Sequence, residues 1–259
     1  MYKIYACLIA LALLMATPAM AHDMWATADK PEAGKPLAMV IGYGHHFPQP
    51  EAIPDEEYGL FNAKLFGPKG EIALTPGTPN YIWNSNEPVE AGTYLAISDV
   101  NPVFWSQTPE GWAMKPKNEA PGAISCGRFI ESAKGIVNVG APGNPEILAT
   151  KVGLPIEIIP SVNPATVKPG QKLPLTVLLQ GQPLAGAIIK ARNAGFQEIA
   201  ESPEASAFSS VTDRNGLVNF VPLAEGDWIL SASYETPYQD LAACDKESYA
   251  TTLFFNIAK

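Results

Sequence analysis

The three histidines of this sequence are the residues best suited to carry chemistry. His22, His45 and His46 are the only histidines among 259 residues, and all of them lie near the start of the chain. Imidazole is the commonest metal ligand among side chains, so this clustering indicates a transition-metal site. The alternative is that His45 and His46 are an exposed pair in a loop and that the position of His22 is a matter of chance.

The first residues predict an export signal. Lys3 precedes an apolar run from Ile4 to Met15, which is too short for the roughly 20 residues of a membrane span. The small-x-small motif ending at Ala21 then predicts cleavage between Ala21 and His22. We therefore expect residues 1–21 to be a signal peptide and the mature protein to reside in the periplasm without spanning a membrane.

Cleavage at this point would give the mature chain an N-terminal histidine. Its α-amine and imidazole Nδ1 would chelate one metal ion, and the imidazole of His45 or His46 would complete a three-nitrogen site. Such a site suits Cu(II) or Ni(II), which accept square-planar nitrogen ligands. Asp23, Glu56 and Glu57 are candidates for an added oxygen ligand, although exposed acids are usually solvated.

Other function classes are disfavoured by charge and by missing motifs. The formal net charge is −9 and the basic residues do not cluster, which argues against nucleic acid or anionic lipid as a partner. No GxSxG motif supports a Ser-His-Asp triad. We therefore expect no enzyme activity. An oxidative copper enzyme with Tyr43 or Phe47 beside the metal remains an alternative.

Two cysteines, Cys126 and Cys244, remain after processing. In an oxidising compartment such a pair is more often a disulfide than two free thiols, so a bridge is predicted. Two buried thiols or a thiolate metal site are the other interpretations.

The composition predicts an all-β chain with little helix. Short apolar runs are separated by 25 prolines and 21 glycines, and no long stripe with helical period is present. The segment from Gly122 to Gly140 is the best place for a short helix or an irregular connection. In the first half, the expected strands are Pro36 to Gly42, Asn62 to Phe66, Tyr81 to Trp83 and Gly92 to Val100.

The second half has the strand and turn spacing of an immunoglobulin-like sandwich. Ala141 to Pro145 resembles a linker, so we expect two β-sandwich domains in tandem, a metal-binding domain over residues 22–150 and an immunoglobulin-like domain over residues 151–259. The expected strands here are Leu154 to Pro160, Lys172 to Leu179, Ile188 to Arg192, Leu217 to Val221, Ile229 to Tyr234 and Tyr249 to Ile257.

Aromatic residues are dense in the first half. Sandwich cores use such side chains routinely, and a surface that binds a partner or stacks on a sugar is the other interpretation. The set consists of Trp25, Tyr43, Trp83, Phe104, Trp105 and Trp112.

Several short motifs, in this order, resemble a bacterial family of periplasmic components of nickel or cobalt uptake systems. The resemblance covers essentially the whole mature chain. It rests on the segments that begin at His22 (HDMW), Gly44 (GHHFP), Gly92 (GTYL), Phe104 (FW), Gly111 (GW), Gly153 (GLPIEIIP), Gly181 (GQPLAG) and Cys244 (CD).

The resemblance implies an accessory protein that binds Ni(II) or Co(II) outside the inner membrane and delivers it to an energy-coupling-factor-type transporter. It implies His22 and His45 as metal ligands, with His46 at a variable position. Cu(II) and Zn(II) remain alternative metals. A copper-binding protein and a metal-indifferent module that binds a glycan or a protein remain alternative functions.

Overall fold

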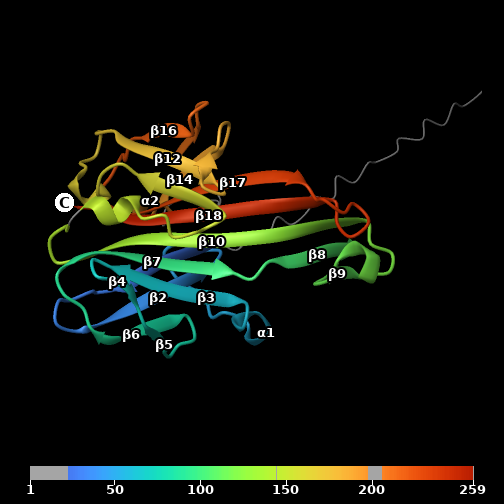
Figure 1. Cartoon of the computed structure of the whole chain (residues 1–259), viewed down its shortest axis with the longest axis horizontal. Coiled ribbons are helices and arrows are strands. Elements are labelled where there is room, and N and C mark those ends of the chain that lie inside the picture. Colours follow the sequence, from blue (N-terminus) through green and yellow to red (C-terminus); the bar gives the residue numbers. More distant parts are fainter. Residues whose placement is uncertain (1–22, 144, 198–205, 259) are drawn as a thin grey trace, which may run out of the picture.

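A computed structural model describes residues 23–143, 145–197 and 206–258. Strands dominate it, and they form two sandwiches (Figure 1). One sheet of the first sandwich has the strand order β1-β2-β6-β5. These strands span Asp23–Asp29, Pro36–Gly44, Ile82–Pro88 and Leu74–Pro76, respectively.

The facing sheet of the first sandwich has the order β10-β7-β3-β4. Its strands span Ser125–Val139, Gly92–Val100, Phe61–Gly67 and Gly70–Ile72. Between β7 and β10 the chain forms a hairpin of β8 (Val103–Thr108) and β9 (Gly111–Ala113), and β8 also pairs with β10. Two short helical segments, α1 (Asp55–Tyr58) and η1 (Lys117–Glu119), lie in the connections.

The second sandwich repeats this pattern. One sheet contains β11 (Ile156–Pro160), β12 (Leu173–Leu179), β13 (Gln182–Pro183) and β16 (Leu217–Phe220). The other has the order β15-β14-β17-β18. Its strands span Phe208–Val211, Ile188–Asn193, Gly226–Pro237 and Lys246–Ile257, and the short helices η2, η3 and α2 span Pro145–Ala149, Pro164–Thr166 and Ala194–Gln197.

Both sandwiches have the immunoglobulin strand topology. In each, the second strand pairs with the first and with a late strand (β2 with β1 and β6, and β12 with β11 and β16). In each sandwich the opposite sheet contains the third strand pair and the last two strands (β3, β4, β7 and β10 in the first, and β14, β15, β17 and β18 in the second), as in immunoglobulin domains. Two immunoglobulin-like β-sandwiches in tandem with little helix are thus confirmed. The predicted boundary between residues 150 and 151 lies between β10 and β11.

The two sandwiches share a single central sheet. Their last strands, β10 and β18, pair in parallel from Gly127 opposite Lys246 to Gly135 opposite Phe254, which joins the two four-stranded sheets edge to edge (Figure 1). Neighbouring residues on β7 and β10 consequently enter different cores. Ile136 packs with the second sandwich, whereas Val137 packs with the first.

The prediction for residues 122–140 was wrong, because most of this segment is the long central strand β10. Both faces of β10 are covered, so its buried residues do not alternate with exposed ones. The strand also carries a buried lysine, Lys134, whose ammonium pairs at 2.8 Å with the carboxylate of Glu157 on β11. Without the expected alternation, the segment lacked the signature of a half-buried strand.

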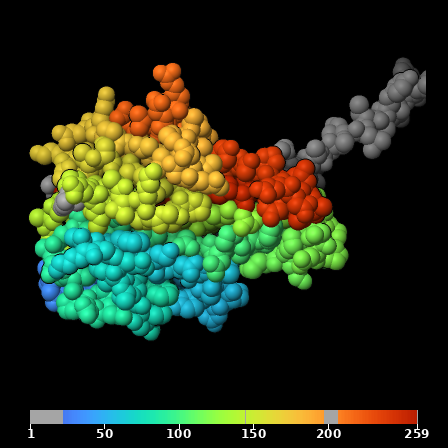
Figure 2. All heavy atoms as spheres, viewed as in Figure 1, coloured from blue at the N-terminus to red at the C-terminus, as the bar shows by residue number. Residues whose placement is uncertain are grey.

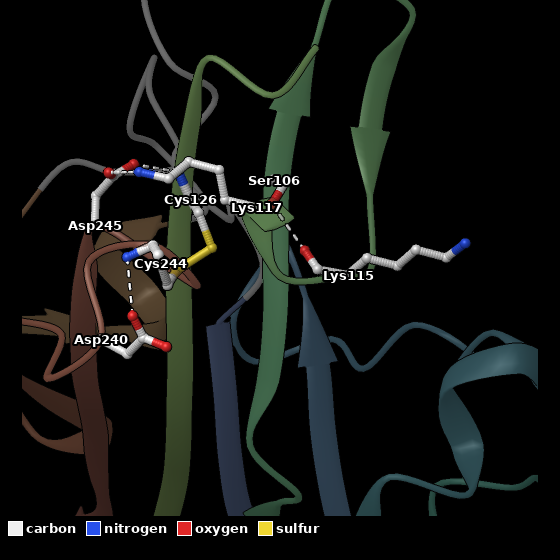
Figure 3. The surroundings of a disulfide bond; sticks show 8 residues. Ser106, Lys115, Lys117, Cys126, Asp240, Cys244 and Asp245 are labelled. Atoms are coloured by element: carbon white, nitrogen blue, oxygen red, sulfur yellow. Dashed lines mark hydrogen bonds and ion pairs between the residues drawn. A yellow bond between two sulfur atoms is a disulfide. The ribbon is translucent and has the colours of Figure 1, made fainter. Parts of the chain in front are cut away.

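The predicted disulfide between Cys126 and Cys244 is confirmed. It joins the start of β10 to the residues before β18 (Figure 3). Green and red segments of the chain project here beyond the two sandwiches (Figure 2). Asp245 reinforces this junction, because its carboxylate forms an ion pair with Lys117 and accepts a 2.8 Å hydrogen bond from the backbone N–H of Cys126. A disulfide is typical of an extracytoplasmic protein. Within the part of the chain that the structure describes, no helix is long and apolar enough to cross a membrane.

Candidate functional site

The predicted histidine segment lies at the end of the β1–β2 hairpin. The two strands are antiparallel, with Asp23 opposite Gly44 and Trp25 opposite Gly42. The Trp25 ring lies directly over Gly42, where a Cβ atom would come within 1.8 Å of it. Gly44 has φ of +138°, a conformation that L-residues with side chains rarely adopt. The two glycines therefore let the strand pass under the indole and turn sharply into His45.

Phe47 anchors the histidine segment to the protein core. Its side chain is 2% exposed and makes edge-to-face contacts with Trp25 and Phe254, at centroid distances of 5.4 and 6.1 Å. Phe254 lies on β18, so the anchor reaches the central sheet. Burial of a phenylalanine of this kind stabilises by roughly 2–3 kcal/mol. The two histidines before Phe47 are thus held at a defined place on the surface.

His45 is oriented by a carboxylate, whereas His46 is exposed. Glu51 Oε1 accepts a 2.8 Å hydrogen bond from the backbone N–H of His45 and lies 3.3 Å from its Nδ1. The two imidazole rings are 6.4 Å apart and tilted by 51°. In the tautomer that donates from Nδ1 to Glu51, Nε2 is the ring nitrogen of His45 that carries the lone pair, which is the arrangement common in metal-binding histidines.

His22 lies outside the described residues, so the predicted three-nitrogen site is not tested. Among the residues that the structure describes, no group of three or more His, Cys, Asp or Glu side chains could hold a metal ion.

The three candidate oxygen ligands either pair with other side chains or are exposed to solvent. Asp23 forms an ion pair with Arg192 on β14, which ties the start of β1 to the second sandwich. Glu57 accepts a 2.9 Å hydrogen bond from the Tyr43 hydroxyl. Burial, and then this carboxylate, raise the pKa of Tyr43 above its usual range. Glu56 lies on α1, exposed to solvent.

Glu131, on β10, is a candidate functional residue that the sequence did not reveal. Burial, followed by the negative charges of Asp23 and Glu57, raises the pKa of its carboxyl to about 7. The Glu131 carboxyl makes no hydrogen bond or ion pair with any described residue. Glu131 is half-buried, and a partly buried carboxyl with a raised pKa is a recognised indicator of a functional position. In the sequence, Glu131 is distinguished only by being an acid within a segment that forms the central strand β10.

The Glu131→Gln variant is expected to remove a pH dependence of stability. Because the folded-state pKa is raised, the folded protein binds more protons than the unfolded chain between about pH 4.5 and 7, and its stability falls as pH rises through that window. At pH 8 the variant should be more stable than the wild type by on the order of 2–3 kcal/mol, with little difference at pH 4. Urea unfolding at several pH values measures this.

Glu119→Gln is the matched control, since Glu119 is exposed on η1. It should alter stability by no more than about 0.5 kcal/mol at any pH. A Glu131→Gln variant that tracks the wild type from pH 4 to 8 would show that Glu131 ionises as an ordinary surface acid.

Fold and site together define a protein of two fused immunoglobulin-like sandwiches with a histidine pair at the end of its first hairpin. Residues 19–236 match the family described as a domain of unknown function (DUF4198), and the chain belongs to that family. The family description assigns no function. A search of curated proteins found no match to this sequence.

Two solved structures of Intimin domains are distantly similar to this chain. The D0-D1 domain of Intimin is 12% identical over 90% of this chain and 97% of that one, with a TM-score of 0.23. The D00-D0 domain of Intimin is 8% identical over 90% of this chain and 100% of that one, with a TM-score of 0.21. Similarities this low carry no argument about this protein, and the fold assignment rests on its own strand topology.

Proposed function

We propose that this protein is a periplasmic carrier of nickel or cobalt that hands the metal to an inner-membrane transporter. The observation that carries the proposal is the register of the first hairpin, which places Asp23 opposite Gly44. Consecutive Cα atoms are only about 3.8 Å apart. We therefore propose that His22, which precedes Asp23, and His45, which follows Gly44, bind the same metal ion.

The proposed ligands are the α-amine and imidazole of His22 and the imidazole of His45. Glu51 supports the proposal, because a carboxylate on Nδ1 fixes the ring and makes Nε2 a stronger ligand. Phe47 supports it as well, since its burial holds the loop in place before metal arrives. His46, being exposed, is proposed as an auxiliary ligand.

Calorimetric titration of the processed, tag-free protein with Ni(II), Co(II), Cu(II) and Zn(II) tests the proposal. Adding one residue before His22 converts the chelating amine into an amide, so we expect Ni(II) affinity to fall by about a hundredfold or more, nearly as far as with His22→Ala. Affinity should also fall as pH drops through about 6 to 7, because protons compete for the imidazole nitrogens. Cu(II) is expected to bind most tightly in vitro regardless of the physiological metal.

The controls separate the proposed site from ordinary surface histidines. His45→Ala should weaken binding strongly, and Glu51→Gln should weaken it by about tenfold, whereas His46→Ala should have a smaller effect. Unchanged Ni(II) and Cu(II) binding by both the extended protein and the His45→Ala/His46→Ala variant would refute the site. Reductant-dependent oxygen consumption by the copper form would indicate an oxidative enzyme instead of a carrier.

A further inference from the structure

A small aromatic pocket lies where the β8–β9 hairpin meets the first sandwich. Tyr43, Trp105, Met114 and Phe129 contribute to its mostly apolar walls, and the carboxylates among its described lining residues are those of Glu57 and Glu131. None of the described residues that line it is a lysine, arginine or histidine. The described lining thus combines aromatic surface with negative charge and contains no balancing cation.

The two carboxylates of the pocket differ in their hydrogen-bond partners. Glu57 accepts a hydrogen bond from Tyr43, which fixes its position. Glu131 lacks a hydrogen-bond donor among the described residues, and its negative neighbours are Asp23 and Glu57. Glu131 is half-buried, and carboxylates withdrawn from water normally have donors or cations as partners, because leaving one unpaired is costly. A cationic donor entering the pocket would supply what Glu131 lacks.

The dimensions of the pocket restrict which cation fits. It encloses about 20 Å³, which is room for one group the size of a water molecule. An ammonium group has this size, whereas a planar guanidinium is larger. The described residues near the pocket offer no third ligand for a metal ion.

The rim of the pocket suits an apolar stem. Met114 lines the pocket and is 42% exposed, and Trp112, on β9 two residues earlier, is also 42% exposed. Exposed aromatic and methionine side chains bind alkyl chains, and aromatic faces attract cations.

We propose that this pocket binds an alkylammonium group, with the ammonium on Glu131 and Glu57 and the alkyl stem on Trp105 and Met114. The group belongs either to a lysine side chain of another protein or to a free alkylamine. His45 and His46 are not among the described residues that line this pocket, and the proposal does not depend on metal binding.

Titration of the processed wild-type protein at pH 8 tests the proposal, with the Trp105 indole signal in NMR spectra as the readout. The probes are N-acetyl-lysine N-methylamide, n-butylammonium chloride and the uncharged N-acetyl-norleucine N-methylamide. We expect saturable binding of the cations, and binding of the norleucine compound weaker by about tenfold or more, because it lacks the charge-assisted hydrogen bond. Tighter binding of the lysine compound than of butylammonium assigns the site to a protein lysine, and equal or weaker binding assigns it to a free amine.

Variants then locate the site. Glu131→Gln should weaken cation binding by about tenfold or more, and the near-isosteric amide should fold because the Glu131 side chain makes no hydrogen bond with the described residues. Glu119→Gln and His45→Ala/His46→Ala should bind the cations like the wild type, so this test is independent of the metal site. The proposal is overturned if the norleucine compound binds wild-type protein as well as the lysine compound does, if neither cation saturates, or if a folded Glu131→Gln variant binds unchanged.

Discussion

The Gly135→Ala variant is expected to lose more than about 3 kcal/mol of unfolding free energy. Gly135 lies on β10 where β1 crosses the central sheet, and an added Cβ would come within 1.8 Å of the Ala26 carbonyl oxygen. Because the obstacle is backbone, no side-chain rotation can relieve it. Either β1 moves away from β10 or the central strand bends, and both changes open the core of the first sandwich. Urea denaturation of purified protein measures the loss.

Gly59→Ala provides the matched control for this prediction. Gly59 has φ of −67°, and nothing lies within 4 Å of the position that a Cβ would occupy. The same chemical change should therefore alter stability by less than about 1 kcal/mol. Equal stabilities of the Gly135→Ala and Gly59→Ala variants would mean that β1 does not press on β10 as closely as described.

Gly135 also explains why the central strand escaped prediction. Glycine is normally read as a strand breaker, and β10 contains glycines at 127 and 135. In the structure these positions make room, Gly127 beside the Phe129 ring and Gly135 beneath the β1 backbone. The role of Gly135 depends on Ala26, a partner far away in the sequence. It cannot be recognised from local composition.

Strands bounded by local turn signals were predictable. The expected strand from Gly92 to Val100 is β7 to the residue, and the strands expected from Pro36 and Lys172 are present as β2 and β12 with bounds shifted by one or two residues. Glycines and prolines end these strands through local turn conformations, which can be recognised from neighbouring residues in the sequence. The pairing of β10 with β18, which fuses the sandwiches, has no local signal because it joins residues more than a hundred positions apart.

The candidate site shows the same division. The residue types and spacing of the histidines were apparent from the sequence, whereas the supporting contacts were not. The sequence does not show that Phe47 packs on Phe254. It also does not distinguish Glu131 from a surface acid, because its location follows from the central position of β10. Long-range packing therefore determines which acidic and aromatic residues contribute to a site.

Lys134→Met is expected to cost about 3–5 kcal/mol in unfolding free energy at pH 8. Lys134 and Glu157 are 1% and 3% exposed, and they pair across the boundary between the two sandwiches. Burial lowers the pKa of Lys134, and Glu157 opposes that effect. Methionine can fill the space of the lysine, but it leaves the Glu157 carboxylate buried without its cation, and removing one partner of a buried pair costs far more than the pair contributes.

The double variant Lys134→Met/Glu157→Leu separates this cost from the value of the pair itself. With both charges replaced by apolar groups of similar volume, stability should return to within about 1 kcal/mol of the wild type or exceed it. The single variant should recover stability as pH falls, since protonation of an unpaired Glu157 relieves the buried charge. Urea unfolding of all three proteins at pH 5 and pH 8 distinguishes the cases. A Lys134→Met variant as stable as the wild type at pH 8 would mean that water reaches Glu157 and that the sandwiches are less tightly joined there than the 2.8 Å pair indicates.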